Sequence, residues 1–230
     1  MAVRKIRKSS TRAVEHRTPR KEEILDVAAA LFAERGVDAV SLAEIAAAVG
    51  LSKPTLYHYF SRKDEILGTI IVTTIRELKI HLERAIAPVD DPRERLIAFL
   101  EAQADFFEQH QTWFQVLIMS FSNLAEPKLR DEAVAWRVNY ENIIKGIIRD
   151  GVRTGDFRGD GINSVVRAVL ASVYWLVRWY RPNGPRRARD IARDYADVVL
   201  YGVAVAPREH PATQAGKRSP KTRRARPAPR

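Results

Sequence analysis

The sequence predicts an all-α protein of about nine helices, in which an N-terminal unit of three short helices precedes a larger C-terminal unit of long helices. Two observations predict this class. Apolar residues recur at three- and four-residue spacing between serines, glycines and prolines that begin or end helices. No alternating strand pattern of useful length and no internal repeat is present. The 230 residues, 46% of them hydrophobic, suffice for a core, and the absence of cysteine excludes disulfide and thiolate chemistry.

The first helix of the N-terminal unit is expected to end at Gly36, where a helix C-terminus favours glycine. Ser41 with Glu44 three residues later predicts a capping box that opens a second helix, which runs to Gly50. Because these helices are short and close together, they should pack as one compact unit.

Two further helix starts are predicted directly after this helix. Ser52 precedes Pro54, a residue tolerated in the first turn of a helix. Ser61 with Asp64 at the third position predicts another start and a helix to about residue 85.

Residues 41–67 read SLAEIAAAVGLSKPTLYHYFSRKDEIL, a helix, a glycine turn and a second helix. Gly50 supplies the positive φ that lets the two helices meet at a steep angle. The apolar residues expected to face inward are Ile45, Val49, Leu51, Leu56 and Phe60. The residues left on or near the outer face of the second helix are Lys53, Thr55, Tyr57, His58 and Tyr59.

In this segment the sequence resembles the DNA-binding domain of the TetR family of bacterial transcriptional regulators. The family pattern is matched at Ser41, Ile45, Ala46, Val49, Gly50, Leu51, Ser52, Pro54, Leu56, Tyr57, Tyr59, Phe60, Lys63, Asp64 and Leu67. Arg62 departs from it, because the family usually has a small polar residue there, and this charge would extend the contact with the DNA backbone.

The resemblance implies that the helix 53–60 enters the major groove of a palindromic double-stranded operator, with Lys53, Thr55 and His58 nearest the base edges. The DNA-binding residues implied are Ser41, Ser52, Lys53, Pro54, Thr55, Tyr57, His58, Tyr59, Arg62 and Lys63.

The remaining contacts are expected to go to phosphates. Tyr57, Tyr59 and Lys63 would set the register without reading sequence. Ser41 and Ser52 lie at helix N-termini, whose backbone N–H groups favour a phosphate oxygen. The alternative for the two tyrosines is partial burial beneath the helix.

The last two helices are expected to form a homodimer, because one helix-turn-helix binds weakly and two copies must be held about 34–36 Å apart. The segment 162–180 is apolar nearly all round, so it needs two partners, its own core and a symmetry mate. The seam expected on residues 191–205 consists of Ile191, Tyr195, Val198, Gly202 and Val205. The resemblance also places the dimer contact of the family on these helices.

Large side chains are concentrated in the middle of the chain. The default interpretation is a hydrophobic core, but the set exceeds what a plain bundle requires, and buried Trp and Tyr need polar partners. A cavity for an apolar small-molecule effector with a polar end is therefore predicted. The candidate ligand-binding residues are Phe106, Trp113, Phe114, Leu117, Phe121, Trp136, Tyr140, Tyr174, Trp175 and Arg178.

The run 177–185, VRWYRPNGP, looks like the end of the penultimate helix in TetR-type regulators of lipid and steroid breakdown, some of which respond to acyl-CoA thioesters. This resemblance implies that Arg178, Arg181, Arg186 and Arg187 face a coenzyme A phosphate. The alternative is a helix end whose arginines interact with carbonyls and solvent.

Charge is concentrated at the two ends. Residues 1–21 and 207–230 each carry eight Lys or Arg and one acid, a net of +7 each, which leaves −3 of the total +11 for 22–206. Such arms lack the apolar content to fold alone and suit a polyanion such as DNA; the alternative is that they only aid solubility. The expected division is a disordered basic arm over 1–19, the DNA-binding domain over 20–66, the ligand-binding and dimerisation domain over 67–206, and a disordered basic tail over 207–230.

No membrane segment is expected, because a span needs roughly 18–20 uninterrupted apolar residues. The charged N-terminus lacks the apolar stretch of a secretory signal. We therefore expect a cytoplasmic, nucleoid-associated protein.

The mechanism expected is repression relieved by a ligand, with the helix 63–85 connecting both domains. The alternative is a basic DNA-organising protein without a ligand. An enzyme is not expected, and neither a cofactor nor a metal is implied, because the five histidines (His16, His58, His81, His110 and His210) are scattered.

Overall fold

The computed structural model describes residues 19–201, and this part of the chain is helical without a strand. The expected all-α class is therefore confirmed. The helices are α2 (Pro19–Arg35), α3 (Leu42–Val49), α4 (Lys53–Tyr59), α5 (Lys63–Ile86), α6 (Pro92–Gln109), α7 (Gln111–Ser120), the 3-10 helix η1 (Phe121–Asn123), α8 (Pro127–Thr154), α9 (Ile162–Tyr174), α10 (Leu176–Trp179) and α11 (Ala188–Tyr201).

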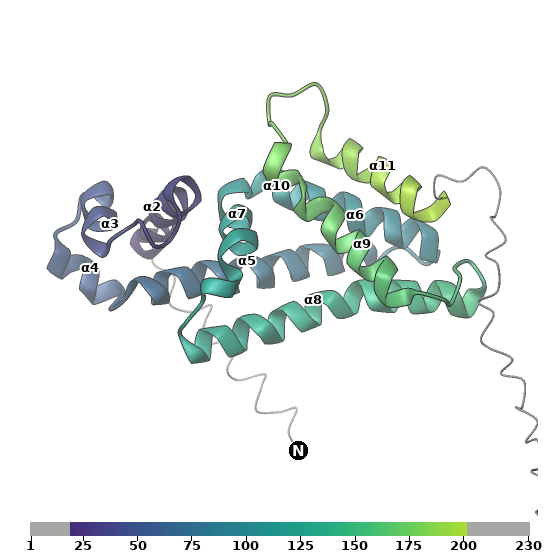
Figure 1. The fold of residues 1–230 in the computed structure, drawn as a ribbon, viewed down its shortest axis with the longest axis horizontal. Helices are drawn as coiled ribbons and strands as arrows, with labels where there is room; N and C mark the ends of the chain where they lie inside the picture. The colour runs from purple at the N-terminus through teal and green to yellow at the C-terminus, as the bar shows by residue number, and fades with distance from the viewer. Residues whose placement is uncertain (1–18, 202–230) are drawn as a thin grey trace, which may run out of the picture.

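The short helices α2, α3 and α4 form a unit at one end of the molecule, and the remaining helices form the larger unit (Figure 1). The long helix α5 begins beside α4 and continues into the larger unit, where α8 runs alongside it. A movement within the larger unit can therefore reach the small unit through one continuous helix.

The capping box predicted at the start of α3 is present. The Glu44 amide donates to the Ser41 hydroxyl at 3.2 Å, and the Ser41 amide donates to the Glu44 carboxylate at 2.8 Å. At the other end Gly50 has a φ of 72°, and the Leu51 amide donates to the Ala46 carbonyl at 2.8 Å. This left-handed residue turns the chain from α3 into α4, as the sequence predicts.

The helix start predicted at Ser61 is wrong in its details. The N-cap of α5 is Arg62, which makes no side-chain capping bond. The Ser61 amide and hydroxyl instead donate to the Glu65 carboxylate, at 2.9 and 3.1 Å, rather than pairing with Asp64. A carboxylate four residues on reaches back to this turn because the N-cap lies one residue later than predicted.

The segment 162–181, expected as one helix, is divided at Trp175 into α9 and the four-residue α10. The Trp175 amide still donates to the Ala171 carbonyl, and the chain resumes helical bonding with the Tyr180 amide donating to Leu176. The buried face continues across the break through Val173, Leu176 and Tyr180, while Trp175 on the other face is 63% exposed.

The larger unit has its core between α5, α6, α7 and α8, closed by α9 and α11. Close packing of α5 on α8 depends on Gly68, since a Cβ there would lie 2.5 Å from Leu129 Cδ1. Among the described residues, no helix is both long and apolar enough to cross a membrane. The two basic arms lie outside the described residues except for Pro19, as do Gly202 and Val205 of the expected dimer seam.

Candidate DNA-binding and effector sites

The helix α4 presents a polar face and a buried face. Leu56 and Phe60 are 0% and 1% exposed and pack on the core of the small unit. Lys53 and His58 are exposed, and Tyr57 is 45% exposed with the Lys53 ammonium 6.0 Å from its ring centroid. This arrangement leaves a cationic and aromatic surface free for contact with a polyanion.

The N-terminus of α4 is organised by a serine. The Ser52 hydroxyl accepts from the Thr55 amide at 3.3 Å and lies 2.7 Å from the Thr55 hydroxyl. Thr55 is half-buried and Pro54 is exposed in the first turn. The cap holds the first turn of α4 in helical geometry, so its side chains are ordered before DNA arrives.

Lys63 does more than the sequence predicted. Its ammonium donates to the carbonyls of Val37 and Val40, at 2.6 and 2.8 Å. These carbonyls belong to the loop between α2 and α3, so Lys63 ties that loop to the start of α5. Arg62 beside it is exposed, and Tyr59 is half-buried, in line with the alternative of partial burial.

Ser41 is engaged within its own capping box, since its hydroxyl donates to Glu44 at 2.7 Å. The Ser41 hydroxyl and amide and the Arg35 guanidinium together hold the pKa of Glu44 at about 2. The N-terminus of α3 therefore carries a carboxylate that is ionised at neutral pH. Contact of Ser41 with a phosphate stays a prediction, and it would have to be made beside this charge.

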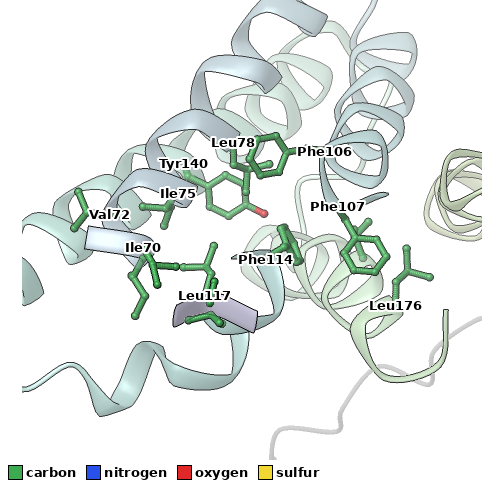
Figure 2. Close-up of a cluster of buried hydrophobic side chains, with 14 of the residues drawn as sticks. Ile70, Val72, Ile75, Leu78, Phe106, Phe107, Phe114, Leu117, Tyr140 and Leu176 are labelled. Carbon is green, nitrogen blue, oxygen red and sulfur yellow. The ribbon is translucent and has the colours of Figure 1, made fainter. Parts of the chain in front are cut away.

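Five of the predicted effector residues lie together in the core of the larger unit, namely Phe106, Phe114, Leu117, Tyr140 and Tyr174. Phe114 and Tyr140 are 0% exposed and Leu117 is 3% exposed. Figure 2 shows them around one another, with Phe106 of α6 beside the Tyr140 ring. Tyr174 of α9 packs edge-on against Phe114, with ring centroids 6.0 Å apart.

The other predicted effector residues lie further out. Phe121 is half-buried beneath the Arg137 guanidinium, 4.8 Å from its ring centroid, and Trp136 is half-buried on α8. Trp175 and Arg178 are exposed, so the structure does not bring them to the group around Tyr140. The physical reason is helical periodicity, because Val173 and Leu176 occupy the buried face and leave Trp175 and Arg178 on the opposite side.

Two of the arginines expected at a coenzyme A phosphate are occupied by carboxylates of the chain itself. Arg186 bonds Asp194 at 2.7 Å, and Arg187 lies 3.7 Å from Glu108. Arg178 and Arg181 are exposed. Contact of these four arginines with a phosphate stays a prediction, and for Arg186 and Arg187 a phosphate would compete with the carboxylates of Asp194 and Glu108.

A cavity of about 360 Å³ lies where the small unit meets the larger one. Phe106 and Trp113 of the predicted effector residues line it, together with residues that the sequence did not single out. Those are Glu22, Asp26, Thr74, Glu77, Gln109, His110, Gln111 and Thr112. The lining residues lie on α2, α5, α6 and α7, with His110 between α6 and α7. Only the tertiary structure brings these helices together, so no local pattern in the sequence could have identified the set.

The helix α7 joins this cavity, the core and the small unit. The Trp113 indole donates to Asp26 of α2 at 2.8 Å, and the Gln115 amide donates to the Ala33 carbonyl of α2 at 3.1 Å. Phe114 and Leu117 on the same helix point into the core. Trp113 and Gln115 therefore link α7 directly to α2, the helix that packs against α3.

A helix-turn-helix with an exposed polar face, joined by a long helix to an aromatic-rich helical unit, defines a class of DNA-binding regulator. Comparison with known proteins identifies the class more closely. Residues 24–70 match the family described as bacterial regulatory proteins, tetR family, and residues 89–203 match the tetracyclin repressor-like C-terminal domain. The chain belongs to the TetR family of transcriptional regulators, which are not enzymes.

Individual relatives match most of the chain. The chain is 28% identical to the transcriptional repressor KstR2 of Mycobacterium tuberculosis over 80% of this chain and 92% of that protein. It is 30% identical to the transcriptional activator FasR of Mycolicibacterium smegmatis over 70% of this chain and 74% of that protein. The crystal structure of PfmR from Thermus thermophilus superposes with a TM-score of 0.73 at 40% identity, covering 79% of this chain and 98% of that one.

Proposed function

We propose that this chain is a dimeric repressor that leaves its operator when a small apolar effector binds the larger unit. The observation that carries the proposal is the geometry of α4, which buries Leu56 and Phe60 and exposes Lys53, Tyr57 and His58. Repression rather than activation is supported by KstR2, which is named a repressor and matches more of this chain than the activator FasR does.

Base reading is assigned to the exposed side chains of α4. Lys53 and His58 would reach base edges, with the Thr55 hydroxyl beside them, while Tyr57 and Arg62 would contact phosphates. The half-buried Tyr59 would contribute through its hydroxyl alone. Lys63 would act mainly by positioning the loop between α2 and α3, since two of its hydrogen bonds go to that loop.

A dimer is supported by an exposed apolar surface on α9 to α11. Trp175, Trp179, Val198 and Tyr201 are 63%, 43%, 53% and 68% exposed. Large apolar side chains gathered in this way indicate an interface that a partner covers. The seam differs from the expected one, because Ile191 is buried against its own subunit.

The effector is proposed to be a lipid- or steroid-derived compound, with acyl-CoA thioesters as the first candidates. The relative KstR2, whose solved structure at 27% identity is described as that of a ketosteroid transcriptional regulator, supports this class. To weaken operator binding 100-fold, the effector must prefer the DNA-incompetent state by about 2.7 kcal/mol. The contacts of α7 with α2 are the route we assign to this coupling.

The proposal is tested in two steps. Selection from random duplexes followed by titration should yield a palindromic operator, and Lys53→Ala or His58→Ala should lose sequence preference while Lys145→Ala on α8 binds as the wild type does. Thermal unfolding with acyl-CoA thioesters beside their free acids should then find compounds that raise Tm and release the operator. Binding without any sequence preference, unaffected by every compound, would instead indicate a DNA-organising protein and overturn the proposal.

A further inference from the structure

Two polar side chains are buried in the core of the larger unit without hydrogen-bond partners among the described residues. The Tyr140 hydroxyl is enclosed, and so are both polar atoms of the Gln103 amide. Both residues are 0% exposed. A buried donor or acceptor without a partner destabilises a folded protein, so such groups in a natural core call for a function.

The two side chains are neighbours. The ring of Phe99, one turn before Gln103 on α6, stacks on the Tyr140 ring with centroids 6.2 Å apart. Burial raises the pKa of Tyr140 well above its ordinary value, nearby Tyr174 raises it further, and the Gln103 amide acts in the opposite direction. The phenol is therefore neutral and keeps its proton available for donation.

The surroundings of this pair are apolar. Figure 2 shows the Tyr140 hydroxyl pointing toward the space between Phe106 and Phe114, with Leu78 and Ile75 beside the ring. Arg137, the cation near Tyr174, is 3.7 Å from Glu141 and lies over Phe121. An ionised ligand group at Tyr140 would therefore lose its hydration, and no free opposite charge would compensate for that loss. Such burial of a charge is strongly unfavourable.

The cavity of about 360 Å³ where the small unit meets the larger one offers a route to Tyr140 and Gln103. Phe106 lines that cavity, and Figure 2 shows the same residue beside Tyr140. Movement of the Phe106 ring would join about 360 Å³ of existing space to the buried hydroxyl. A cavity of this size lies at the lower end of the range that holds small molecules.

We propose that Tyr140 and Gln103 are the specificity-determining pair of the effector site, and that they bind a neutral oxygen, a carbonyl or hydroxyl, on an otherwise apolar effector. The phenol and the amide N–H donate to that oxygen, and the amide oxygen accepts from a hydroxyl. This inference rests on the proposed effector site and names the chemistry of its ligand. Gln103 is a residue that the sequence did not single out, although a glutamine on the apolar face of α6 was a visible signal.

The test uses the full-length protein and three probes of one length: 2-decanone, 1-decanol and decanoate. The two neutral probes should raise Tm at concentrations where decanoate does not. Tyr140→Phe and Gln103→Leu should each weaken binding of the neutral probes roughly two- to tenfold, the range for one hydrogen bond. Equal stabilisation by decanoate, or no stabilisation by either neutral probe, would overturn the inference.

A second measurement is independent of any probe. Without ligand, Tyr140→Phe should raise Tm, because it removes a buried hydroxyl that lacks a partner. The matched control is Tyr180→Phe, since the Tyr180 hydroxyl donates to Glu108 and its loss should lower Tm while leaving probe binding unchanged. A lower Tm for Tyr140→Phe would show that the hydroxyl is satisfied inside the core, and the inference would be wrong.

The outcomes separate this inference from the proposed function. Operator binding by the wild-type protein without any probe tests the proposed function by itself, so it is measured in parallel on the same preparations. Intact operator binding with failed probe results rejects the ligand chemistry alone. If the wild-type protein shows no preference for any operator sequence, the proposed function is rejected.

Discussion

At the scale of single residues, side chains chosen for DNA contact also hold the fold. Lys63 matched the family pattern, yet its ammonium bonds two carbonyls of the loop before α3. Ser41 matched as well, and its hydroxyl and amide complete a capping box. A residue in a DNA-binding pattern can therefore be required because it positions the reading helix rather than because it touches DNA.

Lys63→Met should lower the free energy of unfolding by about 1–3 kcal/mol, because it leaves the Val37 and Val40 carbonyls without their donor. The measurement is urea unfolding followed by circular dichroism. The neighbouring control Arg62→Met, at an exposed side chain, should change stability by less than about 0.5 kcal/mol and act on DNA affinity alone. Equal stability of the two variants would reject the positioning role.

Glu44 predicts a pH dependence. Its pKa falls from 4.5 to about 2 in the folded protein, chiefly through its bonds with Ser41 and then through Arg35. A carboxyl whose folded pKa is lowered stabilises the fold fully above its unfolded pKa, and this contribution is lost as the pH falls through the folded pKa. The wild type should therefore exceed Glu44→Gln in stability at pH 7, and the difference should shrink between pH 4.5 and 2. A constant difference across this range in denaturant titrations would contradict the assignment.

At the scale of elements, the position of each helix depends on close contacts as well as on its caps. The long helices α5 and α8 lie side by side (Figure 1), and Gly68 is buried where they meet. The absence of a side chain there lets Leu129 of α8 lie against the backbone of α5. This contact sets the distance between the helix that reaches the small unit and the helix that carries Tyr140.

Gly68→Ala should destabilise the protein by about 1–3 kcal/mol, because its Cβ would overlap Leu129. Gly146→Ala, on α8 itself, is the matched control, since nothing lies within 4 Å of the added Cβ. That substitution should stabilise the protein by about 0.5–1 kcal/mol through helix propensity. Thermal unfolding of both variants checks the pair, and a stable Gly68→Ala would show that α5 and α8 can move apart at little cost.

At the scale of the whole molecule, the proposed function requires two units and two copies. Within one chain the cavity and the bonds from Trp113 and Gln115 to α2 lie at the junction of the units, next to the unit that contains α4. The exposed apolar residues proposed for the dimer contact lie on the larger unit between α9 and α11, away from α4 (Figure 1). Pairing of two copies through these residues would hold their two α4 helices at a spacing set by the rest of the fold.

Trp175→Glu combined with Val198→Glu should convert the dimer to a monomer and weaken operator binding, because charges would be buried in an apolar interface. Sedimentation velocity measures the assembly state. Val138→Glu is the control, since this valine is 45% exposed on α8, away from the proposed interface. A doubly substituted protein that remained a dimer would place the interface elsewhere.

The sequence by itself determined the helical class, the capping box, the turn at Gly50 and the face of α4 that is exposed. These features depend on neighbours within about four residues, so local spacing and backbone preference are sufficient to predict them. The exposure of Trp175 follows from the same spacing, since the buried residues Val169, Val173 and Leu176 continue at three- and four-residue steps and leave Trp175 on the opposite face. The burial of Tyr140, in contrast, depends on the helices that pack around α8.

Only the tertiary structure decided which polar groups meet. The salt bridge of Arg187 with Glu108, the bond from Trp113 to Asp26 and the closeness of Gln103 to Tyr140 involve residues far apart in the chain. The angle and distance between packed helices determine such contacts, and these depend on how side chains from several helices interlock. For that reason the sequence could predict an effector site, while the pair that we propose to bind the effector became visible only when the helices were assembled.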